Sequence, residues 1–134
     1  MAGARPDRPA VQPELEVVQR WFDAFNRRDL AAAVALAHPE LAFRPLQIHG
    51  AGTWHGREGL EELWARMARV GLDHRVKLTG VHVLDDGRVA ARGLIQPGDA
   101  EFVGVFRVQG GLVLEAEHRF SDEDTLRRLG LPVD

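Results

Sequence analysis

The chain has 134 residues, of which 45% are hydrophobic and 28% are charged, and this balance is typical of a single globular domain. Its net charge of −3 provides no general attraction to nucleic acid or to an anionic membrane, and no apolar run is long enough to span a bilayer. The absence of cysteine excludes disulfides, thiolate metal sites and thiol nucleophiles, and it is consistent with a cytoplasmic protein.

Residues 1–13 contain three prolines and scattered charges, so we expect a disordered leader followed by one folded domain over residues 14–134. From residue 14 onward, apolar side chains recur at three- and four-residue steps, which predicts an amphipathic helix. The stripe consists of Leu15, Val18, Phe22 and Phe25, with Trp21 beside it.

A second helix is predicted over residues 30–37, with Asp29 as its N-cap and an alanine-rich body. Pro39 ends it, because the residue before a proline is disfavoured in the α conformation. Residues 41–48 then read as a strand. Pro45 cannot donate a ladder hydrogen bond, so this strand is expected at an edge or with a bulge.

A glycine-rich loop over residues 50–52 leads to a third helix over residues 57–70, whose early turns carry glutamates. The remainder of the chain has the alternation of β-strands. One hairpin is predicted over residues 74–84 and 88–96, and a second over residues 101–109 and 112–120.

Residues 124–129 are expected to form a short helical turn after Asp122. Helices therefore come first and an antiparallel meander comes last, and this order indicates an α+β domain without internal repeats.

The first two predicted helices, the Gly56-x-x-Gly59 entry into the third helix and the closing Leu129-Gly130-Leu131 together resemble the SnoaL-like branch of the nuclear transport factor 2-like superfamily. The resemblance covers residues 14 to 131. It implies a cone in which three N-terminal helices pack on a strongly curved, mostly antiparallel sheet around an internal apolar cavity. It also implies a homodimer formed through the outer face of the sheet.

The superfamily includes ketosteroid isomerases, which use a tyrosine on the first helix and an aspartate before a proline on the first strand. Trp21 stands at the tyrosine position, and the chain has no tyrosine at all. Arg44 stands before Pro45 where that enzyme needs its carboxylate base, and an arginine does not deprotonate in proteins. This activity is therefore excluded.

His118 is the leading candidate for acid–base chemistry. Alternation places it with the apolar residues of the last strand, and the resemblance to SnoaL-like cyclases implies an acid–base aspartate near this position. Arg44 is the candidate partner that would stabilise developing charge. The alternatives are a core histidine at position 118 and a surface or interface ion pair at position 44. Alternation also groups Leu112 and Leu114 with His118 on the inner face, and it places Glu115 and Glu117 outside.

A metal site is not expected, because the six histidines lack a ligand spacing that fixes them on one face, and no cofactor motif is present. The bulky residues expected around the cavity are Trp21, Phe25, Trp54, Met67, Phe102 and Phe106. Trp54 precedes the third helix from a loop and would act as a lid. For Trp64 and Phe22 we favour a purely structural core position.

These features favour a domain that binds a small hydrophobic or polyketide-like molecule in an apolar cavity. They leave open whether it acts as an isomerase, a cyclase or a hydrolase. The alternative is a non-catalytic ligand-binding or protein-interaction module of the same fold. No nucleic-acid or membrane partner is expected.

Overall fold

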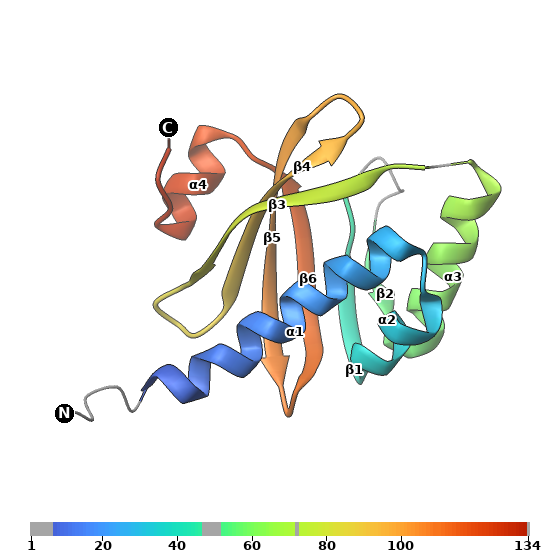
Figure 1. Cartoon of the computed structure of the whole chain (residues 1–134), viewed down its shortest axis with the longest axis horizontal. Helices are drawn as coiled ribbons and strands as arrows, with labels where there is room; N and C mark the ends of the chain where they lie inside the picture. Colours follow the sequence, from blue (N-terminus) through green and yellow to red (C-terminus); the bar gives the residue numbers. More distant parts are fainter. Residues whose placement is uncertain (1–6, 47–51, 72, 134) are drawn as a thin grey trace.

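The computed structural model describes residues 7–46, 52–71 and 73–133. Four helices and one six-stranded sheet make up this part of the chain (Figure 1). In chain order the elements are α1 (Asp7–Arg27), α2 (Leu30–Leu36), β1 (Ala37–Arg44), β2 (Trp54–His55), α3 (Gly56–Arg69), β3 (Arg75–Val83), β4 (Val89–Gln96), β5 (Ala100–Gln109), β6 (Leu112–Phe120) and α4 (Glu123–Leu129). The predicted α+β class is confirmed, with three helices before strand β3 and a fourth helix after β6. Among the described helices, none is both long and apolar enough to cross a membrane.

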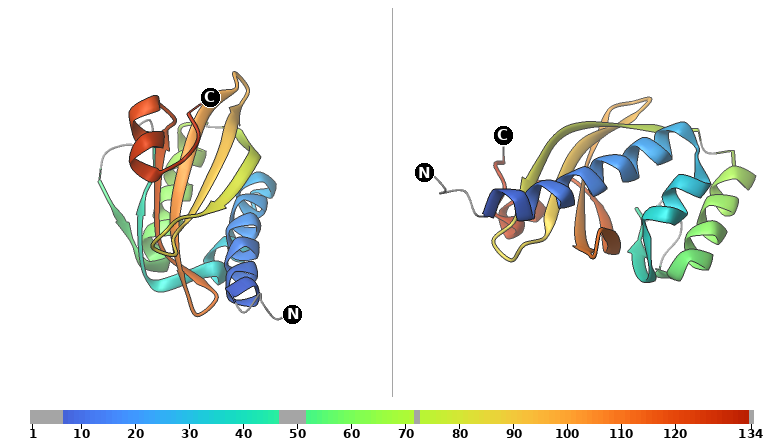
Figure 2. Two further views of the ribbon diagram at one scale, coloured as in Figure 1. Left: turned by 90° about the vertical axis from the view of Figure 1, so that its left-hand side faces the viewer. Right: turned by 60° about the horizontal axis from the view of Figure 1, so that its bottom comes forward.

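The sheet has the order β2-β1-β6-β5-β4-β3, so β2 and β3 are its edge strands. All neighbouring strands are antiparallel except β1 and β6, which pair in parallel. The two C-terminal hairpins occur where the sequence predicts them. Helix α1 lies on one face of the sheet and α4 on the opposite face (Figure 2).

The helix-bearing inner face holds the main core. Helix α1 contributes Val18 and Phe22, and strand β5 contributes Phe102 and Phe106, all of which are buried. Burial of such side chains contributes about 1.5–3 kcal/mol each relative to full exposure. On the outer face, α4 forms a smaller cluster whose members are Ala90, Val103, Leu126 and Leu131.

Several predicted boundaries differ from the structure. Helix α1 begins at Asp7 and continues through Pro13, so it includes part of the expected leader; residues 1–6 lie outside the described part. Strand β1 begins at Ala37, four residues before its predicted start, because parallel pairing to β6 already begins there with the register Ala37↔Val113. Of the predicted strand end and glycine-rich loop, residues 47–51 lie outside the described residues.

The expected inner face of β6 needs a correction. Val113 is fully buried, whereas Leu112 and Leu114 are partly exposed. The reason is a register shift between Arg107 and Val108 in the β5–β6 pairing, which reverses the alternation at the start of β6. Beyond this bulge the prediction is correct for Ala116, which is buried among the core residues of the helix-bearing face.

The C-terminal end of α1 is bonded directly to the edge strand β3. The Asn26 side chain donates from Nδ2 to the Val76 carbonyl oxygen at 2.8 Å and accepts from the Val76 N–H at Oδ1, also at 2.8 Å. The amide thus satisfies both polar groups of one edge-strand residue. This bond pair fixes α1 against the start of β3, where the cavity described below has one of its walls.

Candidate functional site

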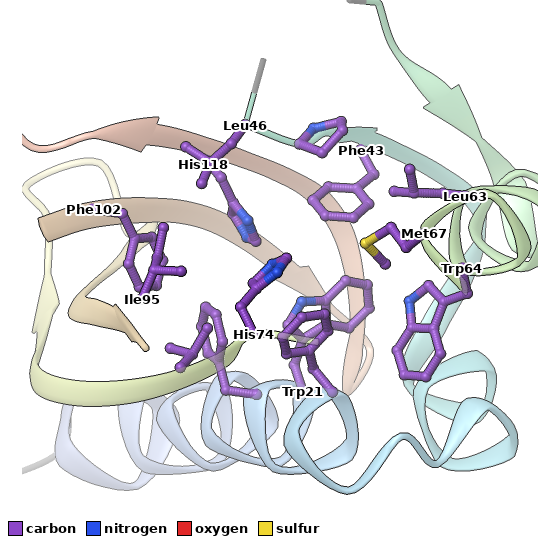
Figure 3. A pocket seen from close by; sticks show the side chains of 14 residues that line it. Trp21, Phe43, Leu46, Leu63, Trp64, Met67, His74, Ile95, Phe102 and His118 are labelled. Atoms are coloured by element: carbon purple, nitrogen blue, oxygen red, sulfur yellow. The ribbon is translucent and has the colours of Figure 1, made fainter. Parts of the chain in front are cut away.

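The inner face encloses a small cavity between α1, α3 and the sheet (Figure 3). Its volume is about 50 Å³. The lining consists of Trp21, Phe22, Phe25, Phe43, Pro45, Leu46, Leu63, Trp64, Met67, His74, Val76, Ile95, Phe102 and His118. Two histidines are therefore the titratable side chains of an otherwise apolar lining.

Helical spacing brings the apolar wall together. Trp21 and Phe25 are four residues apart on α1, as are Leu63 and Met67 on α3, so each pair lies on one face of its helix. Phe25 meets Trp64 edge to face, with ring centroids 6.0 Å apart. This contact between the two helices forms part of the cavity wall.

His118 lies within a cage of aromatic rings. Its imidazole is stacked on Phe22, with centroids 5.7 Å apart and planes at 21°, and the ring of Phe43 meets it edge-on at 5.0 Å. Phe102 and Phe106 complete the cage at 5.8 and 5.7 Å. Four phenylalanine rings thus hold the imidazole in apolar surroundings.

Gly104 makes room for this imidazole. It lies opposite His118 in the β5–β6 register, and a Cβ atom built on it would lie 3.0 Å from the His118 Cδ2 atom and 3.0 Å from the Phe106 ring. A glycine at this strand position therefore has a packing reason, since a larger residue would displace the histidine.

His74 is the second imidazole, and it precedes the edge strand β3. Figure 3 shows the His74 and His118 side chains pointing toward each other in the cavity. Burial lowers the pKa of His74, and the positive charges of Arg28 and Arg75 lower it further, whereas Asp73 opposes the shift. The His74 imidazole is consequently neutral near pH 7 and has a ring nitrogen able to accept a proton.

The structure does not place Arg44 at the cavity. Its side chain is 61% exposed, forms an ion pair with Glu117 at 3.6 Å and donates to the Thr53 hydroxyl at 3.4 Å. Arg44 follows Phe43, which faces the cavity, so strand alternation turns the arginine to the outer face. Arg44 therefore does not share this cavity with His118, and His74 lies across from His118 instead. His118 and Arg44 do line a second pocket together, which also includes Glu117 and Asp122.

The predicted wall residues divide into two groups. Trp21, Phe25, Met67 and Phe102 line the cavity. Phe106 is fully buried beside His118 without lining the cavity, and Trp54 packs against the core from strand β2, paired with Phe43, rather than covering the cavity from a loop. Trp64 and Phe22, expected to have only core positions, both line the cavity.

His74 was missed by sequence reasoning, although the signal is present. His74, Val76 and Leu78 alternate with the charged Arg75 and Lys77. This is the pattern of a strand with one face turned toward the core. The resemblance to the cyclases points to the last strand, and it does not point to His74, the first residue of the strand predicted over residues 74–84.

A metal centre is not formed by the described side chains. Among them, no three histidine, aspartate or glutamate residues cluster closely enough to hold an ion. The cavity lining itself offers two imidazoles and no carboxylate, whereas catalytic zinc sites use three protein ligands.

The sequence matches the SnoaL-like domain family over residues 18–116, so the chain belongs to that family. Its fold is shared with a solved NTF2-like protein. No curated protein matches the sequence.

Solved structures share the fold at low identity. An NTF2-like protein of unknown function from Burkholderia pseudomallei is 19% identical, with a TM-score of 0.69 over 87% of this chain and 97% of that chain. TerC, crystallised with polyporic acid, is 21% identical with a TM-score of 0.71 over 87% and 97% of the two chains. IdmH from Streptomyces antibioticus, a candidate polyketide cyclase, is 23% identical with a TM-score of 0.66 over 90% and 99%. At these identities the likeness establishes the fold alone.

Proposed function

We propose that this protein binds a small, largely apolar molecule in the cavity and catalyses proton transfer on it, as a cyclase or an isomerase does. The observation that carries the proposal is the pair of imidazoles, His74 and His118, facing one apolar cavity. Apolar pockets with a few convergent polar groups are the usual form of small-molecule sites. The fold neighbours TerC, crystallised with polyporic acid, and IdmH, a candidate polyketide cyclase, support a cyclic or polyketide-like ligand.

The proposed chemistry divides the two histidines by role. The lowered pKa of His74 keeps its imidazole neutral, so it acts as the base that removes a proton from a carbon next to a carbonyl group. His118 then donates a hydrogen bond to the carbonyl oxygen as negative charge develops there. The surrounding phenylalanine rings exclude water, which strengthens both interactions.

A thermal-shift screen with apolar cyclic ligands tests the binding step. Ligand at about 100 times its dissociation constant would stabilise the protein by about 2.7 kcal/mol. We expect this shift in the wild type and in Arg44→Gln, a smaller shift in His118→Ala, and none in Leu63→Trp, where the indole fills the cavity. Equal shifts in the wild type and His118→Ala would show that His118 does not contact the ligand.

A non-catalytic ligand-binding or interaction module is the second candidate. It is favoured by the small cavity of about 50 Å³ and by the close packing of His118 among four phenylalanine rings. The two candidates differ in one result, because a non-catalytic module would bind the ligands and leave their carbon-bound hydrogens unexchanged.

We also propose that two copies associate through the outer face of the sheet. Beside the region covered by α4, this face carries cross-strand ion pairs of Arg44 with Glu117 and Arg107 with Glu115. Exposed pairs of this kind contribute little to the stability of one chain, and they suit a partly polar contact. Light scattering would show a dimer at high micromolar concentration; a monomer there would contradict the proposal.

A further inference from the structure

A groove lies directly outside the cavity, between the C-terminal end of α1 and helix α3. Its volume is about 410 Å³ by the same measure as the cavity. Phe25, Trp64, Met67 and His74 line both spaces, so the wall between them is a single layer of side chains. The groove is further lined by Arg28, Leu30, Glu61, Ala65 and Ala68.

The cavity is smaller than an organic ligand, so ligand binding at His118 requires side chains of its wall to move. Pockets for small molecules usually measure about 300–1,000 Å³, whereas the cavity offers about 50 Å³. A ligand that reaches His118 must therefore extend through the shared wall. Met67 is the wall side chain that can most easily change its rotamer, because it is unbranched and half-buried.

The groove ends at a positive charge. The Arg28 guanidinium lies over the Phe25 ring at 4.6 Å and donates to the carbonyl oxygens of Phe25 and His74 at 2.9 and 2.6 Å. The nearby Asp73 is 85% exposed and lies 3.6 Å from Arg28, while it also pairs with Arg75 at 2.9 Å. Two arginines thus share one solvent-exposed carboxylate.

The positive charges of Arg28 and Arg75 affect the pKa values of the groups around them. Burial and the charge of Arg75 lower the pKa of Arg28, and Asp73 compensates in part. The same two arginines lower the pKa of His74. Glu61 also lines the groove, but water screens its exposed carboxylate more than the Arg28 guanidinium, whose side chain is 33% exposed. An anionic group beside Arg28 would therefore be stabilised.

We propose, on the basis of the proposed function, that the ligand is an elongated molecule with an apolar ring at His118 in the cavity and a carboxylate at Arg28 in the groove. The planar guanidinium suits a carboxylate because its donors match both oxygens. Arg28 is then the residue that selects an anionic ligand over a neutral one of the same shape.

The test uses ω-phenylalkanoates with chains of four to eight carbons and the matching ω-phenylalkanols, titrated by calorimetry into the full chain. At the best chain length we expect the carboxylate to bind about tenfold tighter than its alcohol. Arg28→Asn should reduce this preference to less than about threefold, because the preference is a ratio measured within one variant; asparagine also tolerates the positive φ of 57° at this position. The exposed Arg20→Gln on the same helix is the matched control and should retain the full preference.

Salt gives a second readout that needs no variant. The preference of the wild type should decrease as sodium chloride is raised from 0.05 to about 0.5 M, because the groove is open to solvent and the ions screen the contact. Equal affinity of carboxylate and alcohol at every length, or an undiminished preference in Arg28→Asn, would overturn the inference while the apolar site stands. If neither series binds below about 1 mM, the proposed ligand-binding function fails with it.

Discussion

The imidazole of His118 is stacked on the ring of Phe22, with centroids 5.7 Å apart and planes at 21°. The contact joins the last strand of the sheet to the first helix, which are separated by most of the chain. It means that α1 fixes the plane of the imidazole, and hence the direction in which the ring nitrogens of His118 point.

Gly104→Ala should disturb His118 without unfolding the domain. The added methyl group would lie 3.0 Å from Cδ2 of His118, so the imidazole or the Phe106 ring must shift. At an open strand position, replacing glycine by alanine would stabilise by about 0.5–1 kcal/mol. Here we expect a loss of about 1–3 kcal/mol in the free energy of unfolding, together with weaker ligand binding.

Urea unfolding and the imidazole resonances of His118 measure this effect. An increase in stability, with unchanged His118 resonances, would show that the space beside Gly104 is not limiting.

Asn26→Asp should release the start of β3 from α1. The carboxylate can still accept from the Val76 N–H, but it can no longer donate to the Val76 carbonyl oxygen. Leaving this part-buried carbonyl unpaired should cost about 1–3 kcal/mol in urea unfolding. Asp23→Asn, an exposed change on the same helix, serves as control. A loss below about 0.5 kcal/mol for Asn26→Asp would mean that water replaces the bond without penalty.

Stability should depend on the protonation of His74. Its folded pKa lies below the ordinary value of 6.5, so between these two values the unfolded chain binds more protons than the folded one. The contribution of His74 to the free energy of unfolding is therefore fully present above about pH 6.5. This contribution decreases as the pH falls toward the folded pKa, and it no longer changes below that pKa.

The difference between the wild type and His74→Gln, measured by denaturant unfolding from pH 8 to pH 5, isolates this contribution. The wild type should lose more stability than His74→Gln over the interval. His55→Gln, at an exposed position, controls for the removal of any histidine. Parallel curves for the wild type and His74→Gln would contradict the assigned environment of His74.

Much of the fold follows from local sequence patterns. The stripe of Leu15, Val18, Phe22 and Phe25 predicts the inner face of α1, and the turns at Gly87 and Gly110 predict both hairpins. The short strand β2 was not predicted, because two residues carry no periodicity and its pairing to β1 is a tertiary contact. The parallel pairing of β1 with β6 has no local signal either.

The site was predictable only in part. Alternation correctly placed His118 among apolar residues, and helix periodicity placed Trp21 and Met67 near the cavity. Arg44 was chosen from its position in a resemblance to an isomerase, whereas its own alternation with Phe43 already indicated the outer face. His74 immediately precedes the edge strand β3, far from β6 in sequence, so no local pattern indicates that it lines the same cavity as His118.

Deuterium exchange into 2-tetralone tests the central claim most directly. This bicyclic ketone has acidic hydrogens on the carbon between its carbonyl group and its aromatic ring, and ¹H NMR in D₂O follows their loss. General acid–base catalysis contributes about 10²–10⁴-fold to such steps, so we expect the wild type and Arg44→Gln to accelerate exchange clearly above buffer. His118→Phe and His74→Phe should lose most of that acceleration. Identical exchange rates in the wild type, both phenylalanine variants and buffer, with tetralone shown to be bound, would contradict a catalytic role for the two histidines.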